Sequence, residues 1–250
     1  MTFTEHPRFL ARVAGAFYLI IIAFALFAYL HVRGQVIVPG DMAQTATNLL
    51  AQERLYRLGG AAAVVVVVCN LPLGWILFEM LKVVNSCLAL LALFFIIVSA
   101  TIEAVNLSNY FAPLLVFTLP EYRSAFQANE IQALARGPIR MFEYLFSVSL
   151  SFFGVFCLLI GFLIFRSKFL PAILGLLMMA AGVTYWLNCF RLFLALPIPY
   201  LLWVTLVAEL SLALWLVLVG INEAEWREQA GAKQSSAVDR AALPAAPRRC

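Results

Sequence analysis

The stretch Leu145–Phe165, LFSVSLSFFGVFCLLIGFLIF, decides the class of this protein. It contains no Asp, Glu, Lys or Arg. A helix needs about 20 consecutive apolar residues to cross the hydrocarbon core of a membrane, and this stretch reaches that length. It forms most of a longer apolar segment that begins at Ile139. We interpret the whole segment Ile139–Phe165 as a transmembrane helix.

Five further segments have a similar length and apolar character. They are Phe9–Val32, Leu58–Leu81, Ser86–Phe111, Phe169–Leu196 and Tyr200–Ile221. We therefore expect an all-α integral membrane protein, with a single bundle of six transmembrane helices in residues 1–222. After Ile221 the chain becomes charged and then rich in Ala, Ser, Gln and Pro, a composition that does not form a core. Residues 223–250 are accordingly expected to form a disordered cytoplasmic tail.

The composition excludes several classes of protein. Of the 250 residues, 64% are hydrophobic and 12% are charged, against roughly 25% charged in a typical soluble domain. This argues against a soluble enzyme, a disordered chain and a disulfide-rich secreted domain, and makes membrane lipids the surroundings. The net charge of +4 shows no basic cluster of the kind that binds nucleic acid. The five cysteines form no metal-binding pattern, so we expect neither a metal nor a cofactor.

The placement of Lys and Arg indicates the orientation. With a cytoplasmic N-terminus, ten of these residues lie inside and seven outside, which favours cytoplasmic positions for both termini. The two long connections, Val38–Tyr56 and Pro120–Gly137, then lie outside. Each has an apolar face, and Asp41 can cap a helix with Gln44 as its partner. We expect two outer surface helices in these connections.

Two pairs of glycines lie on neighbouring predicted helices. Gly154 and Gly161 are in one helix, and Gly175 and Gly182 are in the next. Each pair is spaced by about two turns, so its members share one helix face. Small residues in this pattern allow helices in membranes to approach closely. We interpret them as helix contacts and not as a site.

Several stretches occur in an order that matches a known family. They are Arg12–Tyr18 (RVAGAFY), Val38–Asp41 (VPGD) with Thr45 and Asn48, Arg57–Gly59 (RLG), Gly161–Ser167 (GFLIFRS), Phe169–Pro171 (FLP), Leu174-Gly175, Glu209 and Leu214–Leu216 (LWL). Together they resemble the bacterial domain of unknown function 4386 family, from about Arg12 to Gly220. The resemblance implies a multi-span protein of a bacterial inner membrane and implies no activity. Phe142 and Phe156 stand where the family pattern leads us to expect histidines, so histidine-dependent chemistry is not expected here.

Charged side chains inside the predicted spans are the candidates for function. A charge at the centre of a bilayer costs about 2.5–3.5 kcal/mol on insertion scales. Such residues are therefore expected to have a structural or functional role. Arg12 and Glu79 lie near the inner surface, with Lys82 one turn from Glu79, and we interpret them as a structural ion pair on the inner side or as side chains that snorkel to water. The other charged residues fall in the outer half of four helices and share faces with polar neighbours. We predict that one outward-facing polar cavity is lined by Glu103, Asn106, Glu143, Asn188, Arg191 and Glu209, and that it holds no metal.

Within this predicted cavity, Arg191 is the expected contact of Glu143, because both lie within about two turns of the outer surface. Three carboxyl groups against Arg191 leave an excess of acid. Either one carboxyl is protonated, with Glu209 as our candidate, or the cavity takes a cation or a proton.

Three functions fit these residues. The first is binding or transport of a small apolar, lipid-like or cationic ligand in the cavity. The second is a structural or partner-binding role, in which the polar groups join helices. The third is a membrane-embedded enzyme that uses Glu103 or Glu209 as a general acid on an apolar substrate, as in terpenoid cyclases, whose motifs this chain lacks. The patterns of NTPases, zinc proteases and serine hydrolases are absent from the sequence.

Overall fold

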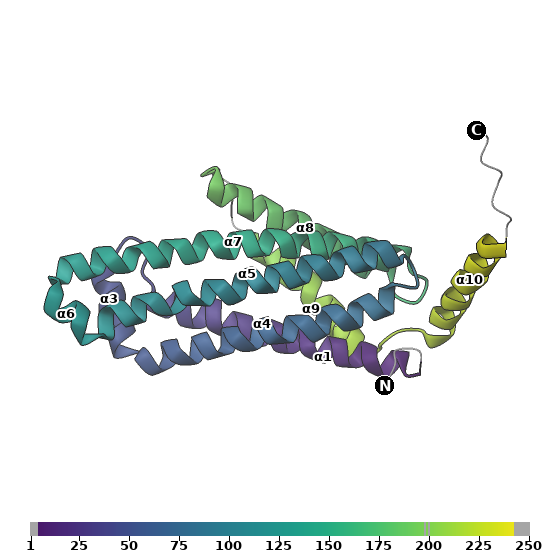
Figure 1. The fold of residues 1–250 in the computed structure, drawn as a ribbon, viewed down its shortest axis with the longest axis horizontal. Coiled ribbons are helices and arrows are strands. Elements are labelled where there is room, and N and C mark those ends of the chain that lie inside the picture. Colours follow the sequence, from purple (N-terminus) through teal and green to yellow (C-terminus); the bar gives the residue numbers. More distant parts are fainter. Residues whose placement is uncertain (1–4, 198, 200, 243–250) are drawn as a thin grey trace.

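The computed structural model describes residues 5–197, 199 and 201–242, with side chains as far as Ala232, and this part consists of helices and the turns between them. Six helical rods form the body of the protein (Figure 1). The first is continuous from α1 (Pro7–Ala25) through a π-helix, η1 (Leu26–Val32), to α2 (Arg33–Val36); the others are α4 (Glu53–Leu81), α5 (Ser86–Thr118), α7 (Ala128–Arg166), α8 (Ala172–Phe193) and α9 (Leu202–Leu218).

The rods close into a ring. α1 packs against α4, α4 against α5, α5 against α7, α7 against α8, α8 against α9, and α9 returns to α1. Figure 1 shows the C-terminal end of α8 diverging from α7. The ring is therefore completed along only part of its length by α8 and α9, which have 22 and 17 residues against 33 and 39 in α5 and α7.

Most of the rods are long enough to cross a membrane. Five of them are long and apolar enough by themselves. α9 meets the same requirement only when it is taken together with α10 (Glu223–Ala242), which follows it across a bend of 99°. With 17 residues, α9 lies at the lower end of the length that spans the hydrocarbon core. The all-helical membrane fold is confirmed, with five helices that can span and a sixth, short one.

The remaining helices lie at the ends of the bundle. α3 (Met42–Ala51) and α6 (Pro120–Ala125) are at one end and α10 is at the other (Figure 1); we call these the α3 end and the α10 end. The predicted cap of α3 is confirmed, because Oδ1 of Asp41 accepts a hydrogen bond from the Gln44 amide at 2.9 Å. The second predicted surface helix is reduced to α6, since the chain from Ala128 onward already belongs to α7.

The C-terminal segment forms a helix where we expected a disordered tail from residue 223. Gly220, with φ of +78°, adopts the left-handed conformation that ends α9 and allows the chain to turn. Trp226 then anchors α10, because its indole N–H donates to the Met80 carbonyl at 2.9 Å and the residue is buried. Residues 243–250 of the predicted tail lie outside the described residues.

The predicted glycine contacts are confirmed between α7 and α8. A Cβ atom added to Gly161 would lie 2.7 Å from the carbonyl oxygen of Gly175, and one added to Gly182 would lie 2.6 Å from that of Gly154. These distances are too short for any side chain, so the two backbones approach directly. This contact fixes α8 against α7 and so positions the polar side chains that α8 carries on its inner face.

Candidate functional site

The ring of helices encloses a cavity of about 560 Å³. This is within the range of pockets that bind small molecules. All six rods contribute to its wall. Its polar and charged lining residues are Tyr29, Arg33, Asn70, Ser99, Glu103, Glu143, Ser147, Ser149, Tyr185, Arg191 and Glu209. The rest of the lining is apolar, so the cavity is amphipathic.

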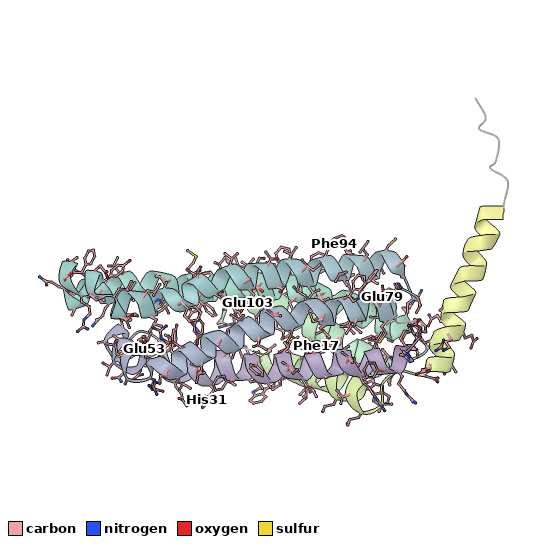
Figure 2. All side chains as sticks on the ribbon, turned by 60° about the horizontal axis from the view of Figure 1, so that its bottom comes forward. Phe17, His31, Glu53, Glu79, Phe94 and Glu103 are labelled. Carbon is pink, nitrogen blue, oxygen red and sulfur yellow. The ribbon has the colours of Figure 1, made fainter. Side chains whose placement is uncertain are left out.

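Four charged residues that the sequence singled out meet in this cavity. Glu103, Glu143, Arg191 and Glu209 all line it, and they come from α5, α7, α8 and α9 respectively. Glu103 and Glu209 are buried, with 5% and 8% of their surface exposed. Figure 2 shows Glu103 near mid-length of the bundle, between Glu53 toward one end and Glu79 toward the other.

Two predicted members of the site do not line the cavity. The side-chain amide of Asn106 donates to the Phe142 carbonyl of α7 at 3.0 Å. Asn188 accepts a hydrogen bond from the Leu201 amide at 3.4 Å, just before α9. Both side chains join helices through backbone groups, so the prediction that they face a ligand is corrected. The sequence places them on the right helices but cannot distinguish a cavity wall from a helix contact.

Glu103 is held by a tyrosine of the π-helix. The Tyr29 hydroxyl donates to Oε1 of Glu103 at 2.5 Å. Tyr29 belongs to η1, and π-helical segments are found frequently at functional sites. The contact joins the first rod to α5, and both residues line the cavity.

Glu209 has tyrosine neighbours from two other helices. The Tyr185 hydroxyl of α8 donates to its Oε1. Tyr18 of α1, which is fully buried, interacts electrostatically with the same carboxyl group. Tyr18 and Tyr29 are 11 residues apart on a continuous rod, so Glu209 lies deeper toward the α10 end by about 16 Å along that rod. The cavity therefore has two carboxyl–tyrosine groups at two depths.

Arg33 supplies a cation at the α3 side of the cavity. Its guanidinium carbon lies 4.0 Å from the centre of the Phe142 ring, a cation–π contact. Its Nη2 lies 4.0 Å from Oε1 of Glu143. The predicted partner of Glu143 was Arg191, whereas the ion pair that the structure gives it is with Arg33. The reason is that the first rod continues beyond Tyr29 and carries Arg33 over α7.

Three buried polar atoms in the cavity wall have no hydrogen-bond partner among the described residues. They are Nη1 of Arg33, Oδ1 of Asn70 and Oε2 of Glu103. Buried polar groups are normally satisfied, and an unsatisfied one costs roughly 1–3 kcal/mol. One donor and two acceptors thus lie buried in side chains that line the same cavity, as in a site built to receive a polar group.

The model of the domain of unknown function 4386 family (DUF4386) matches residues 13–220. The chain belongs to this family. No curated protein and no solved structure matches it. The matched range includes every rod of the ring and every charged residue of the cavity, and it ends before α10. The cavity is therefore part of the DUF4386 domain itself.

Several site residues of this DUF4386 protein were missed at the sequence level. Tyr18, Tyr29 and Tyr185 lie in apolar segments, where an aromatic residue normally belongs to the core. Arg33 was counted among the outer charges. One signal was available: each tyrosine falls on a helix that carries or neighbours a buried carboxyl, and a buried carboxyl needs a donor.

Proposed function

We propose that this DUF4386 protein binds a small or lipid-like ligand in its cavity, and holds or transports it. The observation that carries the proposal is the Glu103 carboxyl. It lies in the wall of an amphipathic cavity, one oxygen is held by Tyr29, and the other is buried without a hydrogen-bond partner among the described residues. Intramembrane carboxyl groups of this kind mark substrate or ion pathways in membrane proteins.

We also propose that the protein lies in the bacterial inner membrane with both termini in the cytoplasm. Lys82 and Lys168 are in the short connections at the α10 end and Arg166 is the last residue of α7 there, and positive charge at such short connections favours the cytoplasmic side. The α3 end then faces outward. Arg33 and Glu143 lie on the α3 side of the cavity, which supports an opening toward the outside.

The orientation predicts the behaviour of terminal fusions. A reporter enzyme that is active only in the periplasm, fused after Cys250, should be inactive, and the same reporter inserted after Gly40 should be active. Gly40 lies in an exposed turn before α3, so an insertion there disturbs little. The reverse pattern of activities would show that the α3 end is cytoplasmic.

Filling the cavity should remove the ligand. Ser147 lies on the cavity wall in α7, and Ser147→Trp places a large ring in the space that the ligand would occupy. We expect native mass spectrometry of the purified protein to show a bound small molecule in the wild type and at least about tenfold less in this variant. A loss of tenfold corresponds to about 1.4 kcal/mol of binding free energy.

The matched control is Met141→Trp, on the same helix but with 52% of its surface exposed. It should retain the ligand. If both variants retain it, the cavity is not the binding site, and a structural role for its polar residues is favoured. If both proteins lose it and also unfold at lower temperature, the comparison must be repeated with Ser147→Phe.

A further inference from the structure

We propose that the ligand carries a primary ammonium group next to an anionic group, as in a phosphoethanolamine headgroup, on an apolar chain. This inference rests on the proposed binding function of the cavity. It specifies the chemistry of the ligand from the polar atoms that the cavity leaves without partners and from the apolar side chains around them.

The ammonium group is recognised by two acceptors. Oε2 of Glu103 and Oδ1 of Asn70 both lack a partner in the cavity wall. Gly74 of α4 lies against Ile96 of α5, and the two helices are antiparallel, so Asn70 is level with about Ala100. That is three residues, or about 4.5 Å along the helix, from Glu103. An ammonium group has three N–H donors and can reach both oxygens at this spacing.

The anionic group is recognised by Arg33. Its guanidinium is always charged, one face lies on the Phe142 ring, and Nη1 has no partner. Glu143 neutralises it only weakly, because the atoms are 4.0 Å apart and the Glu143 side chain is 44% exposed. Arg33 follows Tyr29, which holds Glu103, on the same rod, and Arg33 and Glu103 both line the cavity. A positive site thus lies in the same cavity as the acceptor sites.

Simpler headgroups fit this arrangement less well. A cation alone would leave Nη1 of Arg33 unsatisfied. An anion alone would meet Arg33 but bring negative charge toward the Glu103 carboxyl, which disfavours binding. A quaternary ammonium group has no N–H to donate to Glu103 or Asn70. A group with both an N–H donor and an anion satisfies all three atoms and matches the charges of Arg33 and Glu103.

The apolar chain follows from the remaining wall. Leu26 and Leu30 of η1, Leu150 of α7 and Leu202 at the start of α9 line the same cavity. Leu30 is 57% exposed, so the cavity reaches the outer surface of the bundle beside η1. That surface faces lipid in a membrane protein. A hydrocarbon chain whose head occupies the polar part can therefore leave the cavity toward the bilayer.

The test compares headgroups on the same acyl chains. Purified full-length protein in detergent is titrated with dioleoyl phosphatidylethanolamine, phosphatidylcholine and phosphatidylglycerol, and binding is measured by native mass spectrometry. We expect the ethanolamine lipid to bind at least about tenfold more tightly than the other two, because its ammonium group donates hydrogen bonds to Glu103 and Asn70. Free phosphoethanolamine is titrated in parallel, and binding of the free compound with equal affinity would support the headgroup chemistry with a soluble source and overturn the apolar chain.

Variants link the preference to named atoms. Glu103→Gln and Asn70→Ala should each lower the ethanolamine preference over choline about tenfold or more, and Arg33→Gln should weaken all phosphate-bearing probes. The controls are Glu79→Gln, which breaks an ion pair with Lys82 outside the cavity, and Arg57→Gln, at an exposed pair with Glu53. Both should keep the preference, and thermal unfolding of each protein checks its folding.

The outcome separates this inference from the proposed function. Equal affinity for ethanolamine and choline lipids, or an ethanolamine preference that survives Glu103→Gln and Asn70→Ala, overturns the inference. If a bound molecule is still lost on Ser147→Trp, the cavity binds a ligand of another chemistry and the proposed function stands. If no probe and no copurified molecule depends on Ser147, both fail.

Discussion

Tyr110→Ala is expected to lower the free energy of unfolding by about 3–5 kcal/mol, as large-to-small changes of buried aromatic residues do. Tyr110 is fully buried between α5 and α4. Its hydroxyl donates to the Tyr56 carbonyl at 3.1 Å, and the Tyr56 hydroxyl donates to the Tyr110 carbonyl at 2.6 Å. The two rings are stacked with centres 4.5 Å apart. Truncation therefore leaves a void and removes one of the two reciprocal hydrogen bonds together.

Thermal unfolding in a mild detergent measures this effect. Tyr110→Phe keeps the ring and removes one hydrogen bond, so it should cost only about 0.5–1.5 kcal/mol. Tyr144→Ala is the control for loss of a tyrosine ring, because Tyr144 is 39% exposed. A Tyr110→Ala protein as stable as the Tyr144→Ala protein would show that the reciprocal pair does not hold α4 to α5.

The same substitution should also weaken the site. The Tyr110 ring meets the Phe142 ring edge-on, with centres 5.9 Å apart, and Phe142 is the ring on which Arg33 lies. Loss of Tyr110 removes the support behind Phe142. The affinity for anionic probes should therefore fall in Tyr110→Ala and remain in Tyr144→Ala.

The charged residues of the cavity could be predicted from the sequence, because a charged side chain inside a membrane span costs free energy. An apolar span tolerates an ionisable side chain only for a reason, and the rise per residue gives its depth. This was enough to predict that Glu103, Glu143, Arg191 and Glu209 share one cavity. The glycine contacts of α7 with α8 were predictable on similar grounds, from spacing alone.

The partners of these residues were not predictable to the same degree. Counting by steps of three and four assumes an α-helix, and η1 changes the number of residues per turn, so the direction of Arg33 cannot be obtained by counting. Asn106 and Asn188 share helix faces with cavity residues, yet each is bonded to a neighbouring helix or turn. Contacts between helices decide the partners of these side chains, and such contacts cannot be deduced from residue spacing within one helix.

The C-terminal helix shows the limit of composition. Glu223–Ala242 has a polar composition that predicts disorder in isolation. Trp226 packs against the α10 end of the bundle, and the Asn222 amide donates to the Phe169 carbonyl at 3.2 Å. These anchors start the helix where α9 ends. A single buried tryptophan was the available signal.

Glu209→Gln is expected to preserve folding and to lower ligand binding or turnover at least about tenfold. The Gln side chain has nearly the same shape, and its amide oxygen can still accept the hydrogen bond that Tyr185 donates. It cannot carry a negative charge or release a proton. Glu209 lies at the deep end of the cavity. The side chains that interact with its carboxyl group are those of Tyr185 and Tyr18. Its charge or proton is therefore available to a ligand.

Two further variants make this result specific. Glu209→Leu removes the acceptor of Tyr185, so we expect it to lose both thermal stability and binding, whereas Glu209→Gln loses binding alone. Glu79→Gln, a change of the same kind outside the cavity, should lose neither. Binding by native mass spectrometry and thermal unfolding are measured on the same preparations. If Glu209→Gln binds as the wild type does while Glu209→Leu is destabilised, Glu209 is a structural acceptor that joins α8 to α9, and the ligand is recognised by the shallower Glu103 group alone.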